Sequence, residues 1–198
     1  MFRYVNFQVL PVNSDGEIGA AGYSKIMLGL KGRKDVIFRE RRLQEVAAVL
    51  RNDMFFYAYS IHEESGYFYG QFLKYDLAEQ VENIYTGEVE FNGGNGSSTH
   101  RFYFDYVFDC ERHVFAIEEA GGRLPSAKEL EKAIVHVFSP VVNELFPECV
   151  VEAVVLSEAG KLRDVFEKAD GFYSAEVNVT YSNNRFALKK IKKSESKA

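Results

Sequence analysis

THRFYFDYVFDCERHVFAIEE, the stretch from Thr99 to Glu119, decides the fold of this chain. Strand side chains alternate between two faces, so four aromatic residues share one face and a half-polar set shares the other. The aromatic face holds Phe102, Phe104, Tyr106 and Phe108, and the opposite face holds Arg101, Tyr103, Asp105, Val107 and Asp109. This pattern predicts a β-hairpin with one face in a hydrophobic core.

Beyond the hairpin, the sequence alternates between helical and strand patterns. Ser126 and Glu129 form a capping-box pattern that begins a helix over residues 126–146. Pro140 lies inside this helix and is expected to kink or split it. A strand over 150–156, a short helix that begins at Ser157 and a strand over 172–181 complete a β-β-α-β-α-β order for residues 101–181. The C-terminal β-α-β-α-β part of this order is expected to form a ferredoxin-like half.

On the N-terminal side the patterns are more mixed. Strands are predicted over residues 2–12 and 84–91, and a second hairpin joins residues 54–62 to residues 67–75. Several glycines within residues 17–38 argue against a long helix there, and residues 25–30 fit a strand. Residues 39–51 show helical spacing. The predicted fold class is therefore α+β, with a mainly antiparallel sheet and helices packed on it.

Length and composition favour one soluble domain. The chain has 198 residues, 46% of them hydrophobic, which is enough to bury a core without a disulfide or metal. We expect a single domain over residues 1–181, with a candidate sub-boundary near 92–99, and a flexible basic tail over 182–198. The two cysteines lack metal-site or redox spacing, and no signal peptide or membrane-length apolar run is evident. A cytoplasmic protein without membrane contact is predicted.

Charge is unevenly spread along the chain. The net charge is −5, although residues 185–198 hold six Lys or Arg and one Glu, so the rest of the chain is strongly acidic. An acidic body repels nucleic acid. The tail is either a frayed, solubilising end or a binding segment for nucleic acid or an acidic partner, and the candidate binding residues are Lys189, Lys190, Lys192 and Lys193.

The chain carries no decisive catalytic motif. The Gly-rich loop over residues 93–98 has no Lys and leads into a strand, so it is a hairpin loop and not a phosphate-binding loop. His100 and His113 are candidates for the general acid and base of a metal-independent ribonuclease, with Arg101 stabilising charge. The alternative is that all three are ordinary surface and hairpin-edge residues. No metal site and no cofactor are predicted.

Four segments resemble a bacterial family, the domain of unknown function 4747. They are FRYVNFQVLP at 2–11, GYFYGQFLKYD at 66–76, HRFYFDYVFDCERHVFAIEE at 100–119 and LPSAKELEKAIVHVF at 124–138. The resemblance covers most of residues 1–181. It implies a phage-defence or mobile-element context and supplies no catalytic residues.

Three classes of function follow. The first is a non-enzymatic interaction or regulatory module that acts through a protein partner or as a homo-oligomer. The second is the ribonuclease that uses the hairpin histidines. The third is a nucleic-acid-binding module that uses the basic tail.

Overall fold

The computed structural model describes residues 1–12, 18–94 and 96–156, all of which fall in one unit of the chain. Its helices are α1 (Gly19–Glu40), α2 (Leu43–Val46), α3 (Ala127–Leu145) and the short 3-10 helix η1 (Ala120–Gly122). Its strands are β1 (Phe2–Pro11), β2 (Ala48–Val49), β3 (Phe55–Glu64), β4 (Tyr67–Tyr75), β5 (Gln80–Glu82), β6 (Val89–Asn92), β7 (Arg101–Asp109), β8 (Val114–Glu118) and β9 (Cys149–Val155).

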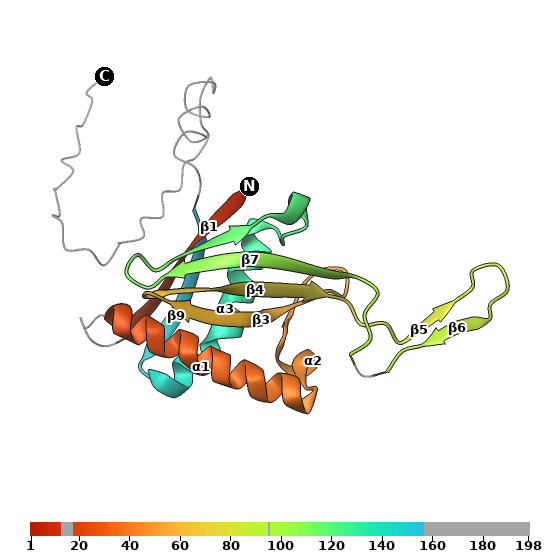
Figure 1. Cartoon of the computed structure of the whole chain (residues 1–198), viewed down its shortest axis with the longest axis horizontal. Coiled ribbons are helices and arrows are strands. Elements are labelled where there is room, and N and C mark those ends of the chain that lie inside the picture. The colour runs from red at the N-terminus through yellow and green to blue at the C-terminus, as the bar shows by residue number, and fades with distance from the viewer. Residues whose placement is uncertain (13–17, 95, 157–198) are drawn as a thin grey trace, which may run out of the picture. The chain divides into compact units, whose positions relative to one another are not determined.

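A seven-stranded sheet in the order β2-β3-β4-β7-β8-β1-β9 organises the molecule. Every neighbouring pair in this sheet is antiparallel, which confirms the predicted α+β class. The sheet is strongly twisted, so that β1 and β9 cross the direction of β3, β4 and β7 (Figure 1). β5 and β6 pair only with each other and form a separate two-stranded sheet.

Both predicted hairpins of the main sheet are confirmed. β7 and β8 pair directly, with Phe108 opposite Phe115, and β4 pairs with β7 over its whole length. The turn between β3 and β4 places Ser65 and Gly66 at positive φ, the geometry that tight hairpin turns require. Phe104, Tyr106 and Phe108 are buried as expected, whereas Phe102 is only partly buried.

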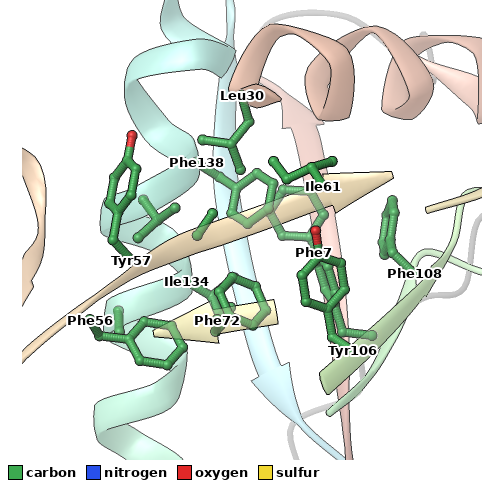
Figure 2. Close-up of a cluster of buried hydrophobic side chains, with 14 of the residues drawn as sticks. Phe7, Leu30, Phe56, Tyr57, Ile61, Phe72, Tyr106, Phe108, Ile134 and Phe138 are labelled. Atoms are coloured by element: carbon green, nitrogen blue, oxygen red, sulfur yellow. The ribbon is translucent and has the colours of Figure 1, made fainter. Parts of the chain in front are cut away.

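Helix α3 supplies the apolar side chains that cover the inner face of the sheet. Its capping box at Ser126 and Glu129 is present as predicted. Phe138 lies 4.6 Å from the ring centre of Phe7 and 5.6 Å from that of Phe115. Figure 2 shows Phe138 and Ile134 of α3 close to the aromatic side chains of the sheet. The core is therefore an aromatic cluster between one sheet face and the helices.

Pro140 does not split α3, which runs as one helix on both sides of the proline. A proline inside a helix costs about 3 kcal/mol because it removes one hydrogen bond and crowds the preceding turn. Val137, Phe138, Val141 and Val142 are all buried around it. Burial of four large side chains outweighs this cost.

The expectation against a long helix over residues 17–38 is wrong, because this segment forms the 22-residue helix α1. Its buried residues follow helical spacing and include Tyr23, Ile26, Met27 and Leu30. Gly29 lies against α3, where an added Cβ would approach Cγ1 of Val141 to 2.8 Å. This glycine permits the close contact of two helices, so its presence does not indicate a broken helix.

Two further sequence predictions need correction. Residues 39–51 do not form one helix, because α1 ends at Glu40, Arg41 takes a left-handed conformation and only the short α2 and β2 follow. Residues 84–91 do not form one strand, because most of them form the turn between β5 and β6. The Asn83 side chain accepts hydrogen bonds from the backbone N–H groups of Tyr85 and Thr86 and thereby stabilises this turn.

The strand predicted over 150–156 is confirmed as β9. The helix predicted from Ser157, the strand predicted over 172–181 and the basic tail lie outside the described residues. Among the helices that the structure describes, none is both long and apolar enough to cross a membrane.

Candidate functional site

The candidate site lies where β4 ends and β7 begins. Tyr75, the last residue of β4, pairs with Arg101, the first residue of β7. Between them the chain leaves the sheet at Asp76 and returns at His100. Residues 77–98, here called the arm, carry β5 and β6 and project away from the main sheet (Figure 1).

Asp76 organises the base of the arm. Its Oδ1 accepts hydrogen bonds from Ser98 Oγ (2.8 Å), Thr99 N (2.8 Å) and His100 N (2.9 Å). Its Oδ2 accepts from Thr99 Oγ1 and lies 2.9 Å from His100 Nδ1. Partial burial acts to raise the pKa of Asp76, but the hydrogen bonds from Thr99, His100 and Ser98 outweigh burial and hold the pKa well below its usual range.

His100 is oriented by this carboxylate. The contact engages Nδ1 and leaves Nε2 as the second ring nitrogen, and the ring is two-thirds exposed. His100 and Arg101 are adjacent at the same end of β7, so the structure keeps these two candidates together. The pair can present one proton acceptor beside one cation.

His113 lies at the other end of β7. Nine residues of extended chain separate it from His100, which corresponds to about 30 Å at a rise of about 3.3 Å per residue. The ring of His113 is buried and stacks on Tyr23 with 4.0 Å between ring centres, and its carbonyl accepts a hydrogen bond from Phe7 N. The structure therefore does not bring the two histidines together as one acid–base pair.

A pocket of about 280 Å³ adjoins the base of the arm, on the sheet face that bears Tyr59 and Tyr103. We call it the aromatic pocket. Helices α1 and α2 border it on one side and the base of the arm on the other. Its lining residues are Phe38, Arg41, Leu43, Gln44, Tyr59, Leu73, Tyr75, Leu77, Gly96, Ser98, Arg101 and Tyr103. No acidic side chain is among them.

Three polar groups of the pocket are distinctive. Arg101 makes no ion pair with any carboxylate in the described ranges. The hydroxyl of Tyr75 is buried and has no hydrogen-bond partner among the described residues, and burial raises the pKa of Tyr75 to about 12. Burial and the neighbouring Tyr59 also raise the pKa of Tyr103. Both tyrosines are therefore neutral hydrogen-bond donors at physiological pH.

The arm exposes apolar side chains to solvent. Ile84 and Tyr85 at its tip are 87% and 91% exposed, and Val81 faces Phe91 across the two strands. The segment from Asp76 to His100 contains one Asp, four Glu and no Lys or Arg. The arm is thus an acidic hairpin with an exposed apolar surface.

The base of the arm is built with close backbone contacts. Gly93 N donates to the carbonyl of Glu79, and Ala78 N donates to the carbonyl of Ser97. A Cβ on Gly93 would lie 1.9 Å from the carbonyl oxygen of Ala78, so only glycine fits there. Together with the Asp76 network, these contacts set the direction in which the arm leaves the sheet.

Other chemistry has little support in the described part of the chain. No group of three or more His, Cys, Asp or Glu there is placed to hold a metal ion. Burial raises the pKa of the Cys110 thiol to about 11, with Asp109 and Glu63 adding to the shift, so this thiol is protonated at neutral pH. The candidate lysines of the tail, Lys189, Lys190, Lys192 and Lys193, lie outside the described residues.

Sequence reasoning overlooked Asp76, Tyr75 and the arm. One signal was available in the sequence. The 25 residues from Asp76 to His100 contain no Lys or Arg, although they include large apolar residues such as Ile84 and Tyr85. The role of Asp76 had no local signal, because its partners follow it by more than 20 residues.

Comparison with known proteins places the chain in a family. No curated protein and no solved structure matches it. A family model described as Domain of unknown function (DUF4747) matches residues 3–193, which is nearly the whole chain. This chain belongs to the DUF4747 family.

Proposed function

We propose that this protein is a non-enzymatic interaction module of a bacterial phage-defence or mobile-element system, and that the arm is its contact surface. The observation that carries the proposal is the exposure of Ile84 and Tyr85 at the tip of a projecting hairpin. The phage-defence or mobile-element context comes from the family resemblance, and the cytoplasmic location is inferred from the cysteine spacing and the lack of an evident signal peptide.

The energetics of the arm favour a partner. A two-stranded hairpin is only marginally stable in water when nothing covers it. Removing a large apolar side chain from water contributes about 1.5–3 kcal/mol, so Ile84 and Tyr85 together can supply a substantial part of a binding free energy. Val81 and Phe91 extend the same apolar surface toward the base.

The charge of the arm defines the chemistry of the partner. Glu79, Glu82, Glu88 and Glu90 lie on the arm, and the arm sequence itself contains no Lys or Arg. Such a surface favours a basic protein surface with apolar side chains, and it repels nucleic acid and a second acidic arm. We therefore assign the arm to a basic protein partner and not to an identical copy.

The test compares two double variants by affinity capture from the bacterial host. Ile84→Ser with Tyr85→Ser removes the apolar tip, and Tyr67→Ser with Val107→Ser is the control, which removes two exposed apolar side chains at the ends of β4 and β7 far from the arm. We expect the first variant to lose a captured protein that the wild type and the second variant retain. A photo-crosslinking residue at position 85 should label that same protein.

Salt and charge provide a second criterion. Changing the four arm glutamates to glutamine, or raising the salt concentration, should weaken the complex because both reduce charge attraction. Equal capture by the wild type and the tip variant contradicts the proposal.

Two outcomes would replace it with the alternatives. RNA cleavage by the wild type that disappears in His100→Ala would support the ribonuclease hypothesis instead. Nucleic-acid binding that depends steeply on salt and disappears on deletion of residues 185–198 would support the hypothesis of a nucleic-acid-binding module.

A further inference from the structure

We propose that the aromatic pocket binds a small planar aromatic molecule that carries one anionic group. The inference does not depend on the proposed function, because the tyrosines and arginines of the pocket lie outside the arm. It rests on three observations: the ring surfaces in the pocket, the absence of acidic lining, and the unpartnered hydroxyl of Tyr75.

Aromatic side chains form one wall of the pocket. Phe38 and Tyr59 meet edge to face with ring centres 5.7 Å apart, and Tyr59 meets Tyr103 in the same way at 4.9 Å. Tyr59 and Tyr103 remain 37% and 36% exposed, so ring surface is accessible there. A flat ligand ring can stack on such a surface and gain both apolar contact and ring–ring attraction.

The charge of the pocket is opposite to that of the protein. Arg41 and Arg101 line it and no Asp or Glu does, although the chain as a whole has a net charge of −5. Arg101 also has no carboxylate partner among the residues that the structure describes. A guanidinium with free donors matches the planar oxygen pairs of carboxylate and phosphate groups.

Tyr75 supplies an unused hydrogen-bond donor. Tyr75 is only 5% exposed, and its hydroxyl has no hydrogen-bond partner in the described structure. Buried polar groups are nearly always paired, because an unpaired one destabilises the fold. Tyr75 and Arg101 face each other across β4 and β7, so one ligand can engage both side chains.

The size of the pocket limits the ligand. A volume of about 280 Å³ lies just below the usual range for small-molecule sites, roughly 300–1,000 Å³. Such a pocket suits one ring system with one charged group. An aromatic carboxylate has this chemistry as a whole, and a mononucleotide has it in its planar base and its phosphate, so the two sources differ in whether the anion is a carboxylate or a phosphate.

Calorimetric titration of the full chain tests the inference with named probes. Adenosine and uridine monophosphates represent the phosphate source, and indole-3-acetate and 4-hydroxybenzoate represent the carboxylate source. Adenosine, phenol and inorganic phosphate are controls that lack either the charge or the ring. We expect at least one aromatic anion to bind with Kd below about 1 mM and its controls to bind at least about tenfold more weakly.

Variants locate the site. Arg101→Gln should weaken binding at least about tenfold, whereas Arg112→Gln, at the far end of β7, should not change it. Tyr75→Phe should weaken binding several-fold without lowering the melting temperature, and Tyr69→Phe is its matched control on the same strand. Thermal melting of each variant separates lost binding from lost folding.

Three results would overturn the inference. The first is that none of the aromatic anions binds. The second is that neutral rings bind as tightly as charged ones. The third is that Arg101→Gln and Tyr75→Phe leave the affinity unchanged. Each of these results is independent of whether the arm binds a protein.

Discussion

At the scale of single residues, Asp76 has the largest structural role at the candidate site. One carboxylate accepts hydrogen bonds from Ser98, Thr99 and His100 and so joins the two ends of the arm. These partners are far from Asp76 in sequence but close in space. A substitution at Asp76 therefore tests both the base of the arm and the rim of the aromatic pocket.

Asp76→Asn should lower the free energy of unfolding by about 1–3 kcal/mol at pH 7, because charge-assisted hydrogen bonds become neutral ones. The folded-state pKa of Asp76 is depressed below the unfolded value of 3.8, so its stabilisation is fully present well above pH 4. It is lost progressively as the pH falls below that value toward the folded pKa. Urea denaturation at pH 7 and pH 3 should show a smaller difference between wild type and variant at pH 3.

Gly93→Ala should disrupt the base of the arm. The added Cβ would lie 1.9 Å from the backbone carbonyl oxygen of Ala78, and backbone cannot move aside as a flexible side chain can. Hydrogen exchange should therefore become faster in residues 77–98 and stay unchanged in β7 and β8. Gly94→Ala is the control, because an added Cβ there meets nothing within 4 Å. Equal exchange in both variants would contradict the close-contact argument.

At the scale of elements, the β7–β8 hairpin contributes the centre of the core. Phe108 and Phe115 stack with 4.2 Å between ring centres, and Phe104 is fully buried beside them in the cluster. The opposite face of β7 is exposed to solvent, as at Asp105 and Val107. Alternate residues of β7 therefore pack in the core, and the residues between them lie at the surface.

Phe104→Ala should reduce the free energy of unfolding by about 3–5 kcal/mol, since it removes a buried ring and leaves a cavity. Val107→Ala, at a 46% exposed position on the same strand, should change it by less than about 0.5 kcal/mol. Denaturant unfolding of both variants measures the difference. A similar small cost at both positions would show that β7 does not face the core as described.

At the scale of the whole molecule, the proposed contact surface lies outside the hydrophobic core. In the main sheet, β4 pairs directly with β7, and the arm lies between these two strands in the sequence. None of the described arm residues is buried. The arm therefore adds exposed surface without adding to the core. Such a division allows the contact surface to change without loss of the fold.

Replacing residues 79–96 with Asn-Gly should leave a folded protein. Ala78 and Ser97 already share a backbone hydrogen bond, and a two-residue turn of this kind closes such a hairpin. We expect the free energy of unfolding to change by less than about 1 kcal/mol, measured by thermal and urea denaturation. A protein that fails to fold would show that the arm is part of the folding unit and would weaken its assignment as a binding surface.

The sequence by itself determined the elements whose signal is local. Period-two alternation identified the β7–β8 hairpin, and a Gly-containing turn between two aromatic segments identified the β3–β4 hairpin. The capping box with its apolar stripe identified α3. The family followed from segments that are themselves local patterns. Local signals failed for residues 17–38, where Gly29 permits a close contact between two helices. They also failed for residues 84–91, where the side chain of Asn83 stabilises a turn in place of the predicted strand.

Only the tertiary structure decided which residues meet. His100 and His113 are both at ends of the same hairpin in sequence, yet the length of β7 holds them apart, because an extended strand separates its ends. Arg101 becomes a neighbour of Tyr75 and Asp76 only because β4 pairs with β7 across the arm that separates them in the sequence. The aromatic pocket is formed by segments between residues 38 and 103, so no single stretch of sequence predicts it. Its charge and its unpaired hydroxyl arise from packing between distant segments, which a one-dimensional pattern does not record.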